Sequence, residues 1–331
     1  MKILFVDLEY DYGIKARGRN VIGQDGFKYS FERLGHEVVD FYYDSFLKNT
    51  KALQTELIEF ADSVKPDLIF FSLYQDQFEH ATLQALSKKY ITLNWFGDDQ
   101  WRFDSFTKHY ANDFTWCVTT DVYSVERYKK LGQFNVICSQ WAAIDSHNID
   151  GDLSQHSYKH DVSFIGGYHP YRGWFISRLE DYGISVSAYG NGWPNGPLSP
   201  EGMNQLFRES KINLNISNST SFDIRYLFSS LKALLLAIKS RKTKSQIKAR
   251  NFEIPFFGGF QLTDYVPTLE SYFDIGKEIV CYSSVEDAAV QIKYFLNNES
   301  LREKVRRAGQ IKAEEEHGYF QRWKVIFENI E

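Results

Sequence analysis

The stretch Ile247-Lys-Ala-Arg-Asn-Phe-Glu-Ile-Pro-Phe-Phe-Gly-Gly-Phe-Gln-Leu-Thr-Asp264 predicts a short helix, a glycine turn and a buried strand. Arg250 and Glu253 are three residues apart, so they share one face of that helix. Pro255 ends the helix soon afterwards because it cannot continue the ladder of main-chain hydrogen bonds. The stretch therefore holds a cation and a carboxylate together at the edge of a sheet.

Such a pair suits a nucleotide. A guanidinium such as that of Arg250 can donate two hydrogen bonds to a diphosphate, and a carboxylate such as that of Glu253 can accept from two ribose hydroxyls. The glycines of the turn, Gly258 and Gly259, are counted with them as donor-binding residues. The alternative is an ordinary ion pair within a helix.

Length, composition and charge favour a globular protein with two ordinary domains. The chain has 331 residues, of which 43% are hydrophobic and 24% charged, and its net charge is −5 without a long basic run, so nucleic acid is not an expected partner. Three cysteines without metal-type spacing, and a first apolar run too short for a signal peptide, predict a cytoplasmic protein. The apolar run at Leu231–Ile238 is too short to cross a bilayer, which leaves peripheral membrane contact open.

Strands and helices alternate through both halves of the chain, which predicts an α/β fold with doubly wound parallel sheets. The strands expected in the first half are Lys2–Val6, Glu37–Tyr42, Asp67–Leu73, Ile91–Phe96, Thr115–Thr119 and Asn135–Ser139. Those expected in the second half are Asp161–Ile165, Ile184–Tyr189, Lys211–Ile216, Phe260–Thr263 and Glu278–Tyr282. A polar linker over 147–160 separates the halves, and one helix is expected across Leu227–Ser240. Ligands of such sheets bind beyond the carboxyl ends of the strands.

The run from Arg250 through Pro255 to Asp264 resembles a recurring segment of bacterial CgeB-like glycosyltransferases. The segments around Asn94–Phe103 and Tyr189–Pro194 resemble further segments of that family, in the family's order. This resemblance implies a GT-B fold, in which two Rossmann-like domains face a cleft. Residues 1–150 would bind the acceptor, 151–316 would bind the donor, and a final helix over 317–331 would cross back to the first domain. The implied co-substrate is a nucleoside-diphosphate sugar, most simply a UDP-sugar, with no other cofactor required.

Asp98 and Asp99 directly follow the strand Ile91–Phe96 at the expected ligand edge of the first domain. A carboxylate there can take the proton of an acceptor hydroxyl as the new bond to the sugar forms. The strand end is similar to that of phage DNA β-glucosyltransferases, which implies that Asp98 is the base, with Asp99 as the alternative. Either residue can equally end a solvated turn or cap a helix. Asp11 and Arg17 lie in the first loop and are assigned to acceptor binding.

Five further residues are expected to bind the donor. Gly166 and Gly167 lie between a strand and a helix, where free main-chain N–H groups form an anion site, and Arg172 can add a charged contact to the diphosphate. Trp193 can pack on the base or ribose, and Asn215 ends a strand at the same edge, followed by Ser217 and Asn218. Alternatively, Gly166 and Gly167 form a plain tight turn, and Trp193 is a packing residue.

One departure concerns stereochemistry. Retaining enzymes of the large GT-B family that carries an E-x7-E pattern have two glutamates, whereas here Glu253 is preceded by Ser245 at the first position. The sequence therefore favours a single inverting displacement without a metal ion. The acceptor would be a surface glycan, a glycolipid or a protein. Modified DNA as the acceptor, a phosphorylase or epimerase, and an inactive sugar-nucleotide-binding scaffold remain the alternatives.

Overall fold

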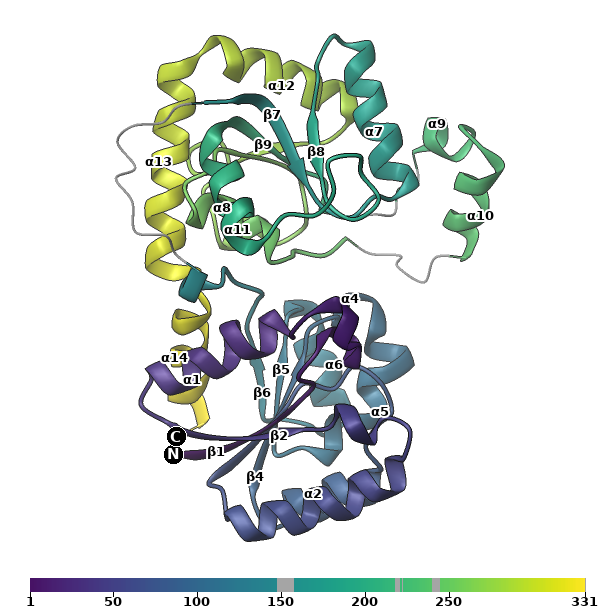
Figure 1. The fold of residues 1–331 in the computed structure, drawn as a ribbon, viewed down its shortest axis with the longest axis vertical. Helices are drawn as coiled ribbons and strands as arrows, with labels where there is room; N and C mark the ends of the chain where they lie inside the picture. The colour runs from purple at the N-terminus through teal and green to yellow at the C-terminus, as the bar shows by residue number, and fades with distance from the viewer. Residues whose placement is uncertain (148–157, 218–220, 222, 240–244, 331) are drawn as a thin grey trace. The chain divides into compact units, whose positions relative to one another are not determined.

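A computed structural model describes residues 1–147, 158–217, 221, 223–239 and 245–330. The chain divides into two compact units (Figure 1). Unit 1 comprises Met1–Ser146 together with Tyr319–Glu331, and unit 2 comprises His147–Gly318. Most of the expected linker, residues 148–157, lies outside the described residues, as does Asn218.

Unit 1 is built on a six-stranded parallel sheet with the order β2-β1-β3-β4-β5-β6. Its strands are β1 (Lys2–Asp7), β2 (Glu37–Tyr42), β3 (Leu68–Phe71), β4 (Ile91–Phe96), β5 (Trp116–Thr119) and β6 (Val136–Cys138). Its α-helices are α1 (Tyr29–Arg33), α2 (Thr50–Val64), α3 (His80–Ser87), α4 (Asp99–Arg102), α5 (Lys108–Tyr110), α6 (Val125–Lys130) and α14 (Tyr319–Ile330). Wider π-type turns precede α1 at Ile22–Lys28 and precede α5 at Phe103–Thr107.

Both faces of this sheet are covered, which explains why β1 reads as an uninterrupted apolar run. Successive side chains of a strand point to opposite faces. Accordingly, Leu4 and Val6 belong to the core cluster on one face, and Ile3 and Phe5 to the cluster on the other. All four are essentially inaccessible to solvent.

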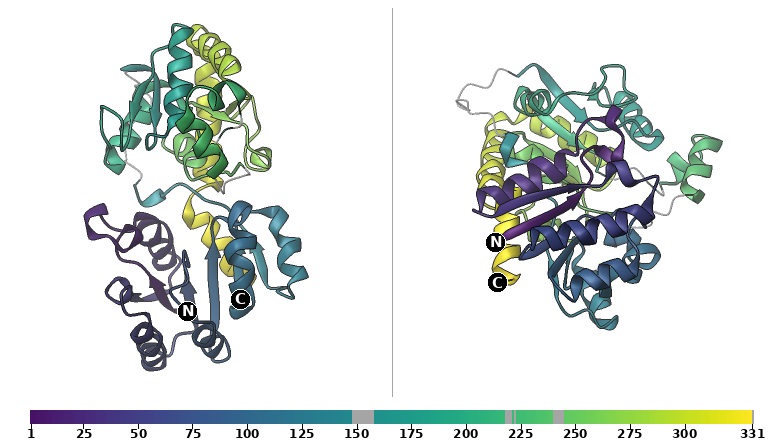
Figure 2. Two further views of the ribbon diagram at one scale, coloured as in Figure 1. Left: turned by 90° about the vertical axis from the view of Figure 1, so that its right-hand side faces the viewer. Right: turned by 60° about the horizontal axis from the view of Figure 1, so that its bottom comes forward.

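The last helix, α14, completes the second of these clusters. Trp323 is fully buried, and its ring meets Phe31 edge to face with the centroids 4.6 Å apart. Phe27 and Phe70 pack against the same indole with centroid distances of 5.1 and 5.3 Å. The end of the chain is therefore part of the core of unit 1, next to α1, as the views of Figure 2 also show.

Unit 2 is built on a five-stranded parallel sheet with the order β11-β10-β9-β7-β8. Its strands are β7 (His160–Ile165), β8 (Ser187–Tyr189), β9 (Ser210–Asn215), β10 (Gln261–Asp264) and β11 (Val280–Tyr282). Its helices are α7 (Pro170–Asp181), α8 (Pro200–Glu209), α9 (Ile224–Leu227), α10 (Leu231–Lys239), α11 (Arg250–Phe256), α12 (Val285–Asn297) and α13 (Glu299–Glu316).

One face of the unit 2 sheet buries a polar network. Ile212 and Leu214 of β9 point into the apolar core, whereas Asn213 and Asn215 point to the other face. The Asn213 side chain donates to Phe207 O and accepts from Ser163 Oγ. Each buried amide is thus hydrogen-bonded, as burial requires.

The prediction of one continuous helix across Leu227–Ser240 is wrong. Two helices, α9 and α10, occupy the region, separated at Phe228–Ser230. Ser229 Oγ donates to Tyr226 O, and Ser230 Oγ accepts from Ala233 N, so the serines end one helix and begin the next. Ser240 lies outside the described residues.

Candidate functional site

In unit 1, a cavity of ≈ 190 Å³ lies beyond the carboxyl ends of three neighbouring strands. Asp7 ends β1 and Leu8 follows it, Tyr74 follows β3, and Gly97 and Asp98 follow β4. The strand order reverses between β1 and β3, and such a switch point is where open parallel sheets bind ligands. The sequence-based expectation of a functional edge and the position of the cavity therefore agree.

Asp7 is the most unusual acid of this cavity. It is 4% exposed, and burial raises its pKa from 3.8 to about 7, against the opposing effect of hydrogen bonds from Leu8 N and Asn20 Nδ2. Those bonds measure 2.8 and 3.1 Å. An acid with a pKa near neutrality is suited to proton transfer at physiological pH. The sequence left Asp7 without an individual role, although its position at the end of the first strand was a usable signal.

Asp98 and Asp99 have different surroundings. Asp98 lines the cavity and stands at the N-cap of α4. Asp99 is fully buried and accepts three hydroxyl hydrogen bonds, from Thr107, Thr119 and Tyr128, at 2.6, 2.6 and 2.7 Å. Burial raises the pKa of Asp99 to about 6, and the hydroxyl groups oppose that rise. Its oxygens are engaged inside the unit, which leaves Asp98 as the member of the pair that a ligand in the cavity can reach.

Several aromatic side chains also line this cavity. Trp95, Trp141 and Phe106 line it, and aromatic ring faces pack well against the C–H surfaces of sugars. Trp95 is 2% exposed, and its Nε1–H has no hydrogen-bond partner among the described residues. A buried donor of this kind at a cavity wall is suited to a ligand oxygen. No local sequence pattern marks this indole N–H group as a ligand donor.

The predicted acceptor-binding residues lie at one side of the cavity. Asp11 lines it. Arg17 is exposed, forms a 3.6 Å ion pair with Asp11, and lies over the Tyr12 ring at 5.1 Å. Arg102 contributes a cation to the wall itself and donates to Tyr74 O at 2.5 Å.

In unit 2, Arg172 marks the corresponding switch point, which falls between β7 and β9. Its guanidinium donates to Gly167 O at 2.9 Å and to Ile216 O at 3.0 and 3.1 Å, so it joins the loops that follow those two strands. The sequence assigned it a direct contact with diphosphate. In the structure these hydrogen bonds go to the main chain, and its charge remains at the edge of the sheet.

The glycine loop before α7 has one open donor. Gly166 N donates to Tyr189 O, whereas Gly167 N has no acceptor among the described residues. A Cβ added at Gly167 would meet only Asn191 O, at 3.9 Å, so the space above it is open. A free N–H group ahead of a helix N-terminus is a favourable contact for an anion.

Arg250 and Glu253 form the predicted ion pair on α11, with Arg250 Nη1 3.0 Å from Glu253 Oε2. Both side chains are largely buried. Burial lowers the pKa of Arg172, the charge of Asp264 raises it, and the charge of Arg250 lowers it, so Arg172 interacts electrostatically with both a carboxylate and a second guanidinium group. Two neighbouring cations favour an anionic ligand.

Trp193 connects the loop after β8 to the loop after β7. Its Nε1–H donates to Gly166 O at 2.8 Å, and its ring packs against Phe164 and Tyr168. Gly190 approaches Gly166 so closely that an added Cβ would lie 2.3 Å from its carbonyl oxygen. Trp193 therefore positions the glycine loop, and a contact with the base or ribose stays a prediction.

Three further residues expected at the donor site are Asn215, Gly258 and Gly259. Asn215 is buried in the sheet and donates to Thr263 Oγ1. Gly258 and Gly259 come immediately before β10, at the amino end of the strand, opposite to the edge where ligands bind. An added Cβ at Gly259 would lie 2.7 Å from Asn213 Nδ2, so this glycine allows close packing. The position of the two glycines does not favour contact with a donor. Asn215 is the last residue of β9, at the carboxyl edge of the sheet, and its contact with the donor stays a prediction.

Within the described residues, no cluster of three or more His, Cys, Asp or Glu side chains is arranged to hold a metal ion.

Comparison with known proteins shows the fold of the chain and a match to one family over part of its length. Residues 172–328 match the model of a family described as glycosyl transferase-like, and no curated protein matches the chain in sequence. Anabaena HepE in complex with UDP is similar over 100% of this chain and 99% of that chain, with a TM-score of 0.63 and 10% identity. HepE in complex with UDP-glucose is similar over the same shares, with a TM-score of 0.59 and 12% identity.

Sucrose-phosphate synthase from Thermosynechococcus elongatus is similar over 100% of this chain and 99% of that chain, with a TM-score of 0.67 and 7% identity. At such identities the likeness shows the fold. The chain has the two-sheet GT-B fold, which confirms the predicted fold class, and the match to the glycosyl transferase-like family is limited to residues 172–328. The finer resemblance to CgeB-like and phage enzymes stays a prediction.

Proposed function

We propose that the protein transfers a sugar from a nucleoside-diphosphate sugar to a hydroxyl group of an acceptor, which is a surface glycan, a glycolipid or a protein. The observation that carries the proposal is the switch point of unit 2. There Arg172 holds the loops after β7 and β9 together, Gly167 N is open, and Arg250 adds a second cation. This group offers a diphosphate both charge and a main-chain donor.

Glu253 completes the donor site in this proposal. Its carboxylate, held by Arg250, accepts hydrogen bonds from the ribose hydroxyls. UDP is the expected nucleotide, because HepE, a protein of the same fold, is known in complexes with UDP and UDP-glucose.

The acceptor occupies the aromatic cavity of unit 1. Asp98 takes the proton of the acceptor hydroxyl while its oxygen attacks the anomeric carbon, and the bond from that carbon to the diphosphate breaks. The nucleoside diphosphate leaves with the electron pair, stabilised by Arg250 and Gly167 N. One displacement inverts the anomeric configuration and needs no metal ion. Asp7, in the same cavity, is the second candidate for the base.

The experiment combines binding and turnover. Calorimetry with UDP tests the donor site, and Arg250→Ala is expected to weaken binding by about tenfold or more, because it removes a charge-assisted contact. An unchanged affinity would count against the donor assignment. Lys277→Ala, an exposed cation near β11, is the matched control and leaves the affinity unchanged.

Turnover separates the chemical roles. Asp98→Asn is expected to lower transfer by at least about a hundredfold while UDP binding persists, since general-base catalysis contributes roughly that much or more. Wild-type turnover in Asp98→Asn and Asp7→Asn alike would remove the base from the proposal. Donor binding with no transfer to any acceptor identifies a scaffold. Consumption of the donor without an acceptor identifies a phosphorylase or epimerase.

A further inference from the structure

The segment that follows β9 has an unusual charge. Residues 223–248 contain seven Lys or Arg and one acidic residue, in a chain whose net charge is −5. Its described part comprises α9 and α10, which extend away from the sheet of unit 2 (Figure 1). A local basic region of this kind attracts an anionic partner.

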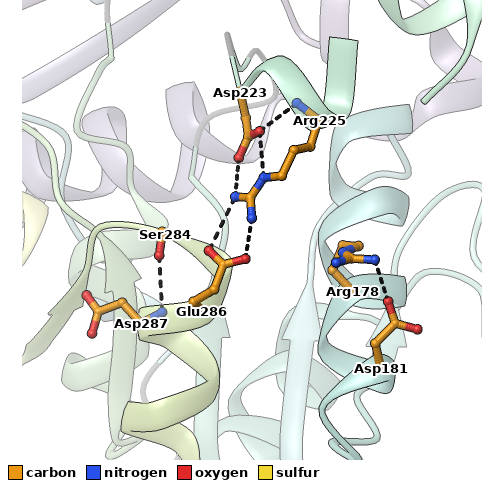
Figure 3. Close-up of polar contacts among 7 residues, drawn as sticks. All are labelled: Arg178, Asp181, Asp223, Arg225, Ser284, Glu286 and Asp287. Atoms are coloured by element: carbon orange, nitrogen blue, oxygen red, sulfur yellow. Dashed lines mark hydrogen bonds and ion pairs between the residues drawn. The ribbon is translucent and has the colours of Figure 1, made fainter. Parts of the chain in front are cut away.

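The first helix of this segment, α9, is fixed to the rest of unit 2. Tyr226 of α9 is buried and packs against Trp174 of α7, with the ring centroids 5.8 Å apart. Arg225 pairs with Asp223 at 2.7 Å and with Glu286 of α12 (Figure 3). The charge of Arg225 is therefore satisfied, and α9 is held in place.

The next helix, α10, presents large apolar side chains to solvent. Leu231 is 82% exposed, Ile238 is 72% exposed, and Leu235 is also exposed. These three residues stand at positions i, i+4 and i+7 and so share one face, which we call the apolar face of α10. Phe228, at the turn before the helix, extends it and is 78% exposed. Exposed apolar groups gathered in this way mark an interaction surface.

The two lysines of α10 lie along one margin of that face. At about 100° per residue, Lys232 and Lys239 lie roughly a quarter turn from the centre of the apolar face. Neither lysine has an acidic partner among the described residues, and Ala233 is buried on the side opposite to the apolar face. Apolar side chains with lysines at their margin are typical of helices that lie in a membrane interface, where lysines reach the headgroups.

We propose that the apolar face of α10 docks on a bilayer containing anionic lipids, with the helix parallel to the surface. Nine residues span about 14 Å, less than half of a bilayer core of roughly 30 Å, and no helix among the described residues is apolar and long enough to cross one. Nucleic acid would use the lysines but leave the leucines in water, and a second copy would bring like charges together. A bilayer with anionic lipids can contact both the lysines and the apolar side chains. This proposal concerns membrane contact and does not depend on sugar transfer.

The test is flotation of the full chain with vesicles, without donor or acceptor. Vesicles of phosphatidylcholine with one third phosphatidylglycerol are compared with vesicles of phosphatidylcholine alone. Binding is expected only to the anionic vesicles and falls with added salt. Lys232→Gln with Lys239→Gln lowers the partition coefficient by about 25-fold, from about fivefold for each lysine.

A second variant tests the apolar face. Leu231→Ser with Leu235→Ser and Ile238→Ser lowers partition by about tenfold or more, because these side chains no longer enter the acyl region. Val290→Ser on α12, where the valine is similarly exposed, is the matched control and leaves partition unchanged. The far-UV circular dichroism spectrum and the urea midpoint of each variant report that unit 2 remains folded.

Several outcomes would overturn the proposal. One is the absence of binding to anionic vesicles at low salt. Another is full binding by the triple serine variant, or equal binding of the wild-type chain to heparin, which has charge but no acyl chains. A third is a concentration-dependent dimer that the serine variant abolishes, because a second copy would then cover this face.

Discussion

The buried carboxyl group of Asp7 leads to a measurable effect of pH on stability. Burial raises its pKa from 3.8 to about 7, so the folded chain keeps a proton that the unfolded chain releases near pH 4. Between these two values the unfolded state binds fewer protons, and the stability of unit 1 therefore falls as the pH rises. A separation of about three pKa units corresponds to roughly 4 kcal/mol.

Asp7→Asn removes this titration. At pH 4 the variant is expected to be less stable than the wild-type chain by about 1 kcal/mol, because one of the two hydrogen bonds to Leu8 N and Asn20 Nδ2 meets an amide N–H group. At pH 8 the wild-type carboxylate is ionised and the variant is not, so the variant becomes more stable by roughly 3 kcal/mol. The order of stability of the two proteins thus reverses with pH.

Urea denaturation between pH 4 and pH 8.5, followed by tryptophan fluorescence, measures this difference. The signal reports mainly on unit 1, which contains Trp95, Trp101, Trp116, Trp141 and Trp323. Asp99→Asn provides a comparison, because burial raises the pKa of Asp99 only to about 6 and the change with pH should be smaller, about 3 kcal/mol. Parallel stability curves for Asp7→Asn and the wild-type chain would refute the reasoning.

Three other predictions concern packing, the switch point of unit 2 and metal dependence. Trp323→Ala is expected to destabilise unit 1 by about 3–5 kcal/mol, because it leaves a cavity between α14 and the sheet. Val325→Ala, on the exposed side of the same helix, should change the urea midpoint little. Similar midpoints for both variants would contradict the packing account. Arg172→Lys keeps the charge, but a lysine cannot reach Gly167 O and Ile216 O together. The variant should therefore lose about 2 kcal/mol of stability and bind UDP more weakly by calorimetry. Wild-type values for both would show that the hydrogen bonds between Arg172 and the two loops are dispensable. Treatment with EDTA should leave the transfer rate unchanged, and a loss that Mg²⁺ or Mn²⁺ restores would argue against a metal-independent reaction.

The sequence by itself determined the fold class and the edges at which function is expected. Buried strands such as β1 and β9 are apolar runs or strict alternations, and strands that alternate with helices can form little other than parallel sheets. The Arg250–Glu253 pair was also predictable, because residues three apart on a helix are neighbours wherever the helix lies.

The tertiary structure decided which of the polar residues are available for chemistry. Asp98 and Asp99 are adjacent in sequence, yet one lines a cavity and the other is buried among three hydroxyl groups contributed by distant segments. The alternation along β9 places Asn215 on one face of the sheet, but no local pattern reveals that this face is buried and polar. The raised pKa of Asp7 likewise depends on burial. Burial and hydrogen bonding arise from contacts between segments far apart in the chain, so only the folded structure could assign them.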